Sequence, residues 1–250
     1  IVGCHGTGWL FSEGKSRART RYFGGTDHYF QTNIPTLAAA IEQAKMPMQF
    51  VMFDDCYMSN IEVAYELRNV TSHLIGCASE VMAYGMPYHK MWRYLAQLSP
   101  DYQRIVNEFH NFYSTYSTPC GNIGITDCAV ADEMAGVMKQ INAAYTFNLA
   151  DTLQVQKLDG YRNTIFYDMG DYVDKLCGGT ALYTAFQSTL SRLVPYKSTT
   201  PSIYTNLGET PSRYISVTRF SGITISDPTV SSYESAFLNK TRTQWWQVTH

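Results

Sequence analysis

Two side chains in the first quarter of the chain have the types that cysteine-dependent acyl transfer needs. This chemistry uses a thiol nucleophile, an imidazole that takes up and returns a proton, and backbone amides that hold the oxyanion. Cys56 and His5 can supply the first two, and the backbone amides of Gly6 and Cys56 can supply the third. Each side chain alone has a simpler explanation, a buried core thiol or a structural loop histidine. The pair together makes catalysis as good an explanation as the structural ones.

Both residues are expected to follow a β-strand. Residues 50–53 form an apolar run that is too short for a helix and rich in strand formers, so Cys56 lies just beyond a buried strand. Residues 1–4 are typical of the end of another strand, which leads into His5. If these strands are neighbours, both side chains emerge at the rim of the sheet where open α/β sheets place their ligands.

A helix is expected soon after Cys56. Ser59-Asn60-Ile61-Glu62 matches a Ser-x-x-Glu capping box, and an apolar stripe continues from it to Arg68. The dipole of a helix favours a thiolate near its amino terminus. This environment therefore suits a nucleophile.

Other apolar patterns indicate alternating helices and strands. Helices are expected over residues 33–45, 99–116, 127–158 and 168–193 and at Trp245-Trp246. Strands are expected over residues 74–78, 123–126, 214–218 and 222–225. This alternation is typical of an α/β fold whose parallel strands are joined by right-handed crossovers. Residues 11–32 are expected to be irregular.

The composition excludes several classes of function. The 250 residues are 45% hydrophobic and 16% charged, which is ordinary for a globular enzyme. A formal net charge of -2 gives no electrostatic basis for binding nucleic acid. No C-x-x-C pair or histidine spacing indicates a metal site, and no run approaches the roughly 20 apolar residues of a membrane span. We expect no nucleic-acid partner, no membrane span and no metal.

Several motifs resemble the clostripain family of cysteine peptidases, which belongs with caspases, legumain and gingipains to a caspase-like clan. They are His5-Gly6-Thr7-Gly8-Trp9, Phe53-Asp54-Asp55-Cys56-Tyr57-Met58, Glu62-Val63-Ala64, Ser79-Glu80, Tyr84-Gly85-Met86-Pro87-Tyr88, Asp168-Met169-Gly170-Asp171-Tyr172 and Phe220-Ser221-Gly222-Ile223-Thr224-Ile225. The resemblance implies a caspase-like three-layer sandwich, with a mostly parallel central sheet flanked by helices. It implies a single peptidase domain over residues 1–250, truncated at its amino-terminal side, because the family has further strands before the histidine strand.

The resemblance also implies roles for individual residues. His5 would be the general base and acid, and Cys56 the nucleophile that forms a thioester acyl-enzyme. In the family an acidic residue two positions before the cysteine lies in the specificity pocket. Here it is Asp54, which predicts cleavage after Arg or Lys because a carboxylate pairs well with a cation. Ser79 and Glu80 are further expected substrate-binding residues.

Asp55 departs from the common Asp-Ala-Cys of the family. A second carboxylate beside the nucleophile would disfavour the thiolate and could alter the pocket. The alternative, which we favour, is that Asp55 points to solvent or caps the following turn. Cys4 adjoins His5, but its side chain should point to the opposite face of its strand. We expect Cys4 and Cys77 to be buried in the core.

The family also predicts activation by self-cleavage. Several members are zymogens that are cut between the histidine and the cysteine, where residues 11–32 form a candidate processing loop containing Lys15, Arg17, Arg19 and Arg21. The alternative is a solvated loop with ordinary surface charge. Autoprocessing would leave the chain's own amino-terminal fragment as a partner.

Cofactor and location follow from the same resemblance. The chemistry requires no cofactor. Calcium, which some relatives use, could contact Asp168 and Asp171, although a role at a helix amino terminus explains both equally well. Members of the family are commonly exported by bacteria, so a secreted or cell-envelope location is expected.

The resulting prediction is a cysteine endopeptidase that acts on proteins or peptides. Two alternatives remain. A transpeptidase or ligase would resolve the same acyl-enzyme with an amine instead of water. A non-catalytic caspase-like binding domain would keep only the fold, and the presence of both His5 and Cys56 argues against it.

Overall fold

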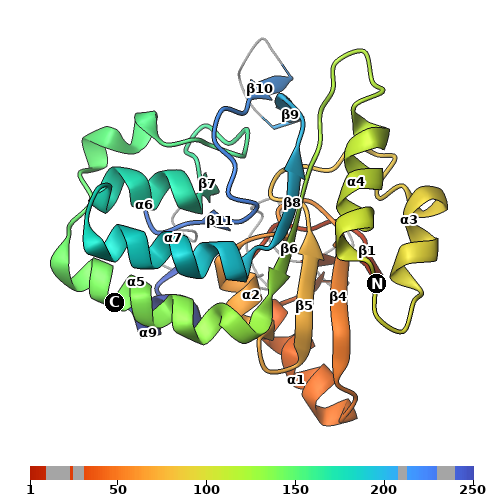
Figure 1. Ribbon diagram of the computed structural model, residues 1–250, viewed down its shortest axis with the longest axis horizontal. Coiled ribbons are helices and arrows are strands. Elements are labelled where there is room, and N and C mark those ends of the chain that lie inside the picture. The colour runs from red at the N-terminus through yellow and green to blue at the C-terminus, as the bar shows by residue number, and fades with distance from the viewer. Residues whose placement is uncertain (10–22, 25–30, 208–212, 230–239) are drawn as a thin grey trace.

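A five-stranded sheet forms the centre of the molecule, in a computed structural model that describes residues 1–9, 23–24, 31–207, 213–229 and 240–250 (Figure 1). In spatial order its strands are β1 (Val2–Gly3), β4 (Met48–Asp54), β5 (Thr71–Gly76), β6 (Asn122–Asp127) and β8 (Tyr196–Thr199). β1, β4 and β5 are parallel, β6 is antiparallel to β5, and β8 is antiparallel to β6. Four of the five strands therefore point the same way.

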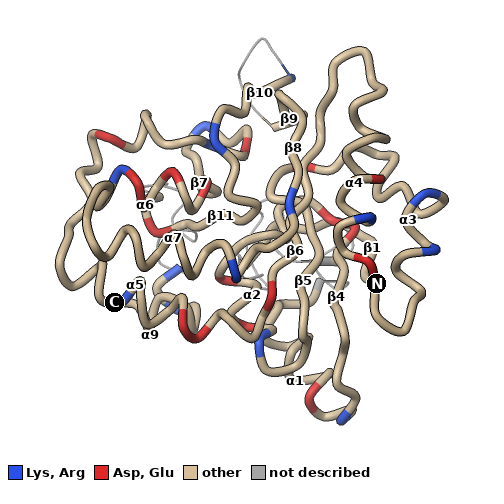
Figure 2. The backbone as a smooth tube through the Cα atoms, in the orientation of Figure 1, with Lys and Arg blue, Asp and Glu red and all other residues tan. Residues whose placement is uncertain are grey.

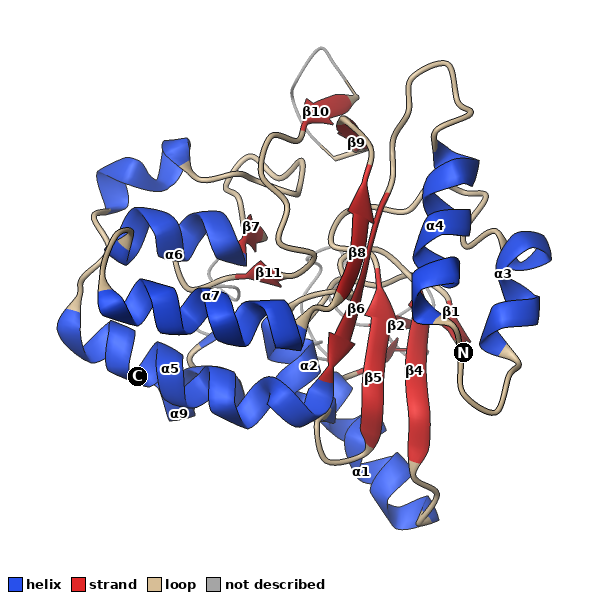
Figure 3. Ribbon diagram, in the orientation of Figure 1, coloured by secondary structure: helices blue, strands red, loops and turns tan. Residues whose placement is uncertain are grey.

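Helices cover both faces of this sheet, which confirms the predicted α/β fold (Figure 3). One face carries α3 (Tyr88–Leu95) and α4 (Tyr102–Tyr113). The helices of the other side are α1 (Ile34–Ala44), α2 (Ile61–Leu67), α5 (Ala131–Ala144), α6 (Met169–Cys177), α7 (Ala181–Leu193) and α9 (Gln244–Thr249). Alternate side chains of β4 point to opposite faces of the sheet and belong to two separate hydrophobic clusters. Val51 and Phe53 pack on the α2 side, and Met52 packs on the α4 side.

Two helix starts differ from the prediction. The side chain of Asn60, not Ser59, caps α2 by accepting from the backbone N–H of Val63 at 2.9 Å. The capping box is wrong because the Ser59 hydroxyl instead donates to the backbone oxygen of Gly222. α4 begins at Tyr102 with Asp101 as its cap, two residues after the proline that was expected to open it.

Other elements were expected in the wrong place or not at all. The helix expected over residues 127–158 ends at Ala144, and a 3-10 helix, η3 (Leu149–Gln154), follows it. Gly178 and Gly179 divide the helix expected over residues 168–193 into α6 and α7. The sequence did not predict α3, β8, β2 (Phe23–Gly24), β3 (Gln31–Thr32), β7 (Tyr167–Asp168) or β9 (Ser202–Tyr204).

The carboxyl-terminal strands are short. β10 (Tyr214–Ser216) pairs with β9, and β11 (Thr224–Ile225) pairs with β7, both antiparallel. Most of the expected loop over residues 11–32 lies outside the described residues. Among the helices that are described, none is long and apolar enough to cross a membrane.

Candidate active site

The pairing of β1 with β4 places His5 and Cys56 at one rim of the sheet. Val2 lies opposite Phe53 and Gly3 opposite Asp54 in a parallel register, and each strand ends two residues before its candidate catalytic residue. The strands expected to be neighbours are therefore neighbours. The backbone of His5 is fixed further by two hydrogen bonds with Gly24, of 3.1 and 3.0 Å. Among the described contacts no hydrogen bond joins the imidazole to the thiol.

Gly6 packs directly on the turn that carries Cys56. A Cβ atom at Gly6 would lie 2.6 Å from the backbone oxygen of Cys56 and 2.6 Å from the Cβ of Asp55. Real Cβ atoms do not approach other atoms so closely, so only glycine fits without a backbone shift. The two residues whose amides are candidates for the oxyanion hole are thus in contact.

The surroundings of Cys56 disfavour its thiolate in the free protein. The backbone N–H of Val81 donates to its sulfur at 3.3 Å. Burial and then the carboxylates of Glu80, Asp55 and Asp54 together raise the pKa of the thiol to about 11. The expected helix α2 begins at Ile61, five residues after Cys56, and its favourable effect on the thiolate stays a prediction.

The turn after the nucleophile is held in an uncommon conformation. Tyr57 has a φ of 61°, in the left-handed region that non-glycine residues rarely occupy. Its backbone N–H donates to the oxygen of Ser79 at 3.0 Å, and its ring stacks on Phe166 with centroids 4.9 Å apart. These contacts offset the strain and fix the position of Cys56.

Asp54 lies beside a loop that sequence reasoning did not assign to the site. One carboxylate oxygen accepts from the backbone N–H of Met86 at 2.8 Å. Gly85 has a φ of 63°, and a Cβ there would lie 2.7 Å from the Asp54 carboxylate. Asp54 also acts on Tyr88. Burial and then the charge of Asp54 raise the pKa of the Tyr88 phenol. In the sequence, Gly85, Met86 and Tyr88 are marked only by the motif Tyr84-Gly85-Met86-Pro87-Tyr88, which resembles the clostripain family.

Ser79 and Glu80 lie next to Cys56, and other protein groups engage their side chains. The Ser79 hydroxyl accepts from the side-chain amide of Asn122 at 2.6 Å. Glu80 accepts from the backbone N–H of Asn206 at 2.8 Å. Both side chains hold segments that border the candidate site. Asn122, which also accepts from the backbone N–H of Ala78, was not found from the sequence because only its place on β6 reveals its role.

A family match agrees with this geometry. The sequence matches the clostripain family over residues 1–219, which include both strands and both candidate catalytic residues. The chain belongs to the clostripain family. It is a cysteine peptidase, as the resemblance of its motifs predicted. No curated protein matches it.

Solved clostripain structures share the fold. A secreted C11 cysteine protease from Bacteroides thetaiotaomicron, "iotapain", is 47% identical with a TM-score of 0.90, covering 99% of this chain and 70% of that chain. A clostripain from Bacteroides thetaiotaomicron ATCC 29148, in complex with the peptide inhibitor BTN-VLTK-AOMK, is 48% identical with a TM-score of 0.86, covering 92% and 99%. An inactive zymogen C11 protease from Parabacteroides distasonis is 27% identical with a TM-score of 0.78, covering 99% and 70%.

Two expectations about residues beside the clostripain dyad are wrong. Asp55 is not directed to solvent, because it is 1% exposed and accepts from the backbone N–H of Cys4. Cys4 is not in the core, because it is exposed and its thiol lies 3.4 Å from the other oxygen of Asp55. The parallel register explains both findings, since it sets Cys4 opposite Asp55. Cys77 is buried, as predicted.

Of the remaining expected site residues, four are not described by the structure, and Asp168 and Asp171 have structural partners. Lys15, Arg17, Arg19 and Arg21 are outside the described residues. Asp168 caps α6 by accepting from the backbone N–H of Asp171, and it also accepts from Ser221. Asp171 accepts from the backbone N–H of Gln156. These carboxylates are engaged by protein donors and do not fit a calcium ion, and the described residues contain no cluster of metal-ligating side chains.

Proposed function

We propose that this clostripain is an endopeptidase that cleaves after Arg or Lys, with His5 and Cys56 as a catalytic dyad. The observation that carries the proposal is the parallel pairing of β1 with β4, which delivers both residues to one rim of the sheet. The contact of Gly6 with the backbone of Cys56 supports an oxyanion hole at the same place. Protein or peptide substrates follow from the peptidase family.

The protonation state of the thiol determines the order of events. Because burial raises the pKa of Cys56 to about 11, His5 acts as a general base while the sulfur attacks the carbonyl carbon. The amides of Gly6 and Cys56 hold the oxyanion that forms. The imidazolium of His5 then protonates the leaving amine, which leaves a thioester on Cys56. Water, deprotonated by His5, attacks the thioester, and the acid product and the free thiol are released.

The charges near Cys56 support basic specificity. Asp54, Asp55 and Glu80 together make the site negative, which favours a cationic substrate side chain. Asp54 is the residue proposed to pair with that cation, and the backbone N–H of Met86 orients its carboxylate. The relative from Bacteroides thetaiotaomicron was solved with an inhibitor named BTN-VLTK-AOMK, whose peptide part ends in lysine.

Binding of a cationic side chain also has a consequence for the nucleophile. A positive charge beside Asp54 offsets part of the field that raises the pKa of Cys56. Substrate binding therefore makes the thiol easier to deprotonate. In this proposal Ser79 and Glu80 act as substrate-binding residues by holding the segments that border the pocket.

A panel of fluorogenic peptides tests the proposal. The peptides differ only in the residue before the scissile bond, which is Arg, Lys, Asn, Asp or Ala. We expect cleavage of the Arg and Lys peptides, and its loss in Cys56→Ala and His5→Ala. Cleavage of the neutral peptides alone would support the proposed peptidase activity but contradict the proposed specificity for Arg and Lys. No cleavage of any peptide by a processed and correctly folded preparation would overturn the proposed activity.

We also propose that the protein is a zymogen that cuts itself within residues 11–32. Its Lys and Arg residues match the proposed specificity, and a relative is described as an inactive zymogen. Gly24, within this interval, forms two hydrogen bonds with the backbone of His5, so part of the interval lies next to the dyad. Intact-mass analysis tests this step. We expect active preparations to be cut, with the amino-terminal fragment retained, and Cys56→Ala to stay whole. A fully active, uncut chain would contradict processing as activation.

We propose a secreted or cell-envelope location for the protein. Its support is the description of a 47% identical relative as secreted. Fractionation of cells that express the native gene tests the location, and recovery of the protein only from the cytosolic fraction would contradict it.

A further inference from the structure

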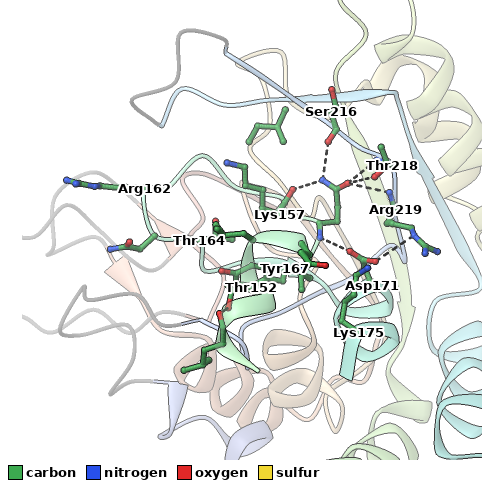
Figure 4. Close-up of a pocket in the computed structure, with 17 residues that line it drawn as sticks. Thr152, Lys157, Arg162, Thr164, Tyr167, Asp171, Lys175, Ser216, Thr218 and Arg219 are labelled. Carbon is green, nitrogen blue, oxygen red and sulfur yellow. Dashed lines mark hydrogen bonds and ion pairs between the residues drawn. The ribbon is translucent and has the colours of Figure 1, made fainter. Parts of the chain in front are cut away.

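A pocket of about 680 Å³ lies away from the dyad and is lined by positive side chains (Figure 4). Its walls come from η3, from the chain between η3 and β7, from Tyr167 of β7, from α6, and from residues 215–219. We call it the basic pocket and define it by its four cations, which are Lys157, Arg162, Lys175 and Arg219. Figure 2 shows Lys and Arg positions next to Asp and Glu positions around β7 and α6, and the whole chain has a formal net charge of -2.

One of these four cations is paired with carboxylates, and Lys157 lies in the field of the buried Asp159. Arg219 is paired, because it lies 3.7 Å from Asp171 and 3.3 Å from Asp174. Lys157, Arg162 and Lys175 form no ion pair with a carboxylate of the described residues. Asp171 is the one acidic side chain among the lining residues, and Asp174 just outside them pairs with the same arginine, so four cations against two carboxylates leave a formal charge of +2.

The polar groups at the centre of the pocket are already engaged with one another. The side-chain amide of Gln156 donates to the backbone oxygens of Lys157 and Ser216, at 2.9 and 3.1 Å. Its oxygen accepts from the backbone N–H of Thr218 at 2.9 Å. Asp171 is likewise occupied by the backbone N–H of Gln156 and by Arg219. Gln156 and Asp171 are therefore not free for a ligand, and the cations without an ion pair among the described residues, Lys157, Arg162 and Lys175, favour an anion.

Two leucines border the same pocket and are open to solvent. Leu149 and Leu153 are 59% and 96% exposed, and both lie on η3. Large apolar side chains at the edge of a charged pocket add contact area for a ligand with apolar groups. The volume of the pocket is in the range of about 300–1,000 Å³ that holds drug-sized ligands. A short peptide that combines acidic and apolar side chains fits these features better than a small inorganic anion.

The basic pocket shares a wall with the candidate active site. Arg162, Asn163 and Thr164 line the pocket, while Tyr161 and Phe166 on either side of them contact the ring of Tyr57. Tyr57 directly follows Cys56. One short segment therefore separates the two sites, so a protein bound at the dyad could reach the pocket with a neighbouring segment.

We propose that the basic pocket is an exosite that binds an acidic, leucine-containing segment of a protein substrate. That the bound segment belongs to a substrate rests on the proposed peptidase function, whereas binding of the segment itself does not. Lys157, Arg162 and Lys175 pair with its carboxylates, and Leu149 and Leu153 contact its apolar side chains.

Direct binding tests the proposal without catalysis. The full chain carrying Cys56→Ala is titrated against a fluorescein-labelled peptide of alternating glutamate and leucine, and fluorescence anisotropy is recorded. We expect saturable binding that weakens with salt, and weaker binding of a glutamate–serine peptide. The double variant Arg162→Gln/Lys175→Gln changes exposed side chains and should lower the affinity about tenfold, since exposed ion pairs are individually weak. The double variant Arg104→Gln/Lys139→Gln removes the same charge from α4 and α5 and should bind normally.

Cleavage then tests the link to substrates. A small Arg or Lys peptide should be cut equally by the wild type and by Arg162→Gln/Lys175→Gln. Adding an acidic leucine-containing segment to that peptide should lower KM in the wild type only. If the small peptide is not cut at all, the proposed function fails while the binding result stands.

Several outcomes would overturn the exosite. They are no binding of the acidic peptide to the wild type, equal binding by the two double variants, and equal binding of a lysine–leucine peptide. Inorganic phosphate that binds as tightly as the acidic peptide would also overturn it, because the pocket would then be a site for a simple anion.

Discussion

The backbone N–H of Cys4 donates to the buried carboxylate of Asp55, and the Cys4 thiol lies 3.4 Å from the other oxygen of that carboxylate. Asp55 therefore anchors the end of β1 immediately before His5. It also stands beside the nucleophile, where its charge helps to raise the pKa of Cys56. The same carboxylate thus positions one member of the dyad and disfavours ionisation of the other.

Asp55→Asn should separate these two effects. The amide keeps an acceptor for Cys4 but removes the negative charge, so we expect the pKa of Cys56 to fall. Because one pKa unit changes the thiolate fraction tenfold, alkylation by iodoacetamide at about pH 8 should be roughly three- to tenfold faster. Peptide mass mapping of labelled Cys56 measures the rate. Asp132→Asn, at an exposed position on α5, serves as the control. An unchanged alkylation rate would show that Asp55 has no electrostatic effect on the thiol.

Gly6→Ala should separate the two catalytic strands. A Cβ at Gly6 would lie 2.6 Å from the Cys56 oxygen, whereas a Cβ at Gly3 would lie 3.8 Å from its nearest neighbour. A displacement of about 1 Å in a catalytic group can cost 100-fold in rate, so we expect kcat/KM to fall about 100-fold in Gly6→Ala. Gly3→Ala is the matched control and should retain activity. Kinetics are measured at a temperature where circular dichroism shows both variants folded. Equal activity in the two variants would contradict the close packing.

Sequence reasoning succeeded where a feature is determined by nearby residues. The apolar run of β4 and the period of α1 mark these elements without reference to the rest of the chain. His5 and Cys56 were found because each follows such a strand. Asp54 was found because it lies two positions before Cys56 in a family motif. That motif contains no information about the contacts of Asp54 with Met86 and Gly85.

Features that depend on a distant partner were missed. β8 has no buried residue, so no apolar pattern marks it, and it exists because β6 supplies its hydrogen bonds. The direction of β6 is determined by the return of the chain from α4, which no local period encodes. Asp55 was expected at the surface because an isolated carboxylate is costly to bury, and the donor that allows its burial comes from β1.

Asp54→Asn should reduce cleavage after basic residues specifically. The amide oxygen can still accept from the backbone N–H of Met86, so the loop stays in place while the charge is lost. A hydrogen bond to a charged group contributes roughly 1.5–3 kcal/mol, which predicts a loss of about 10- to 150-fold in kcat/KM for Arg and Lys peptides. Initial rates for the Arg and Ala peptides measure this change. An equal loss for both peptides would mean that Asp54 supports the site without contacting the substrate.

Two buried carboxyl groups, those of Glu62 and Asp227, interact near α2, the helix that follows Cys56 in the sequence. Glu62, on α2, accepts from the backbone N–H of Ser226 at 2.7 Å, and its second oxygen has no partner among the described residues. Burial, and then the nearby Asp227, raise the pKa of Glu62 to about 8. Burial outweighs the charge of Lys240 and raises the pKa of Asp227 to about 7. Glu62 is therefore protonated in the folded protein at pH values where it is ionised in the unfolded chain.

Glu62→Gln should change the pH dependence of stability in a defined direction. A raised pKa in the folded state means that the stabilising contribution of protonated Glu62 is present at low pH and is lost as pH rises toward about 8. The free energy of unfolding should thus fall by up to about 1.4 kcal/mol per pH unit for this one proton. Gln cannot ionise and keeps an acceptor for Ser226. We expect urea unfolding to show Glu62→Gln gaining stability relative to the wild type from about pH 5 to pH 8. The exposed Glu42→Gln should show no such gain. If the difference between wild type and Glu62→Gln is constant across this range, Glu62 is ionised in the folded protein and its burial is offset by a cation.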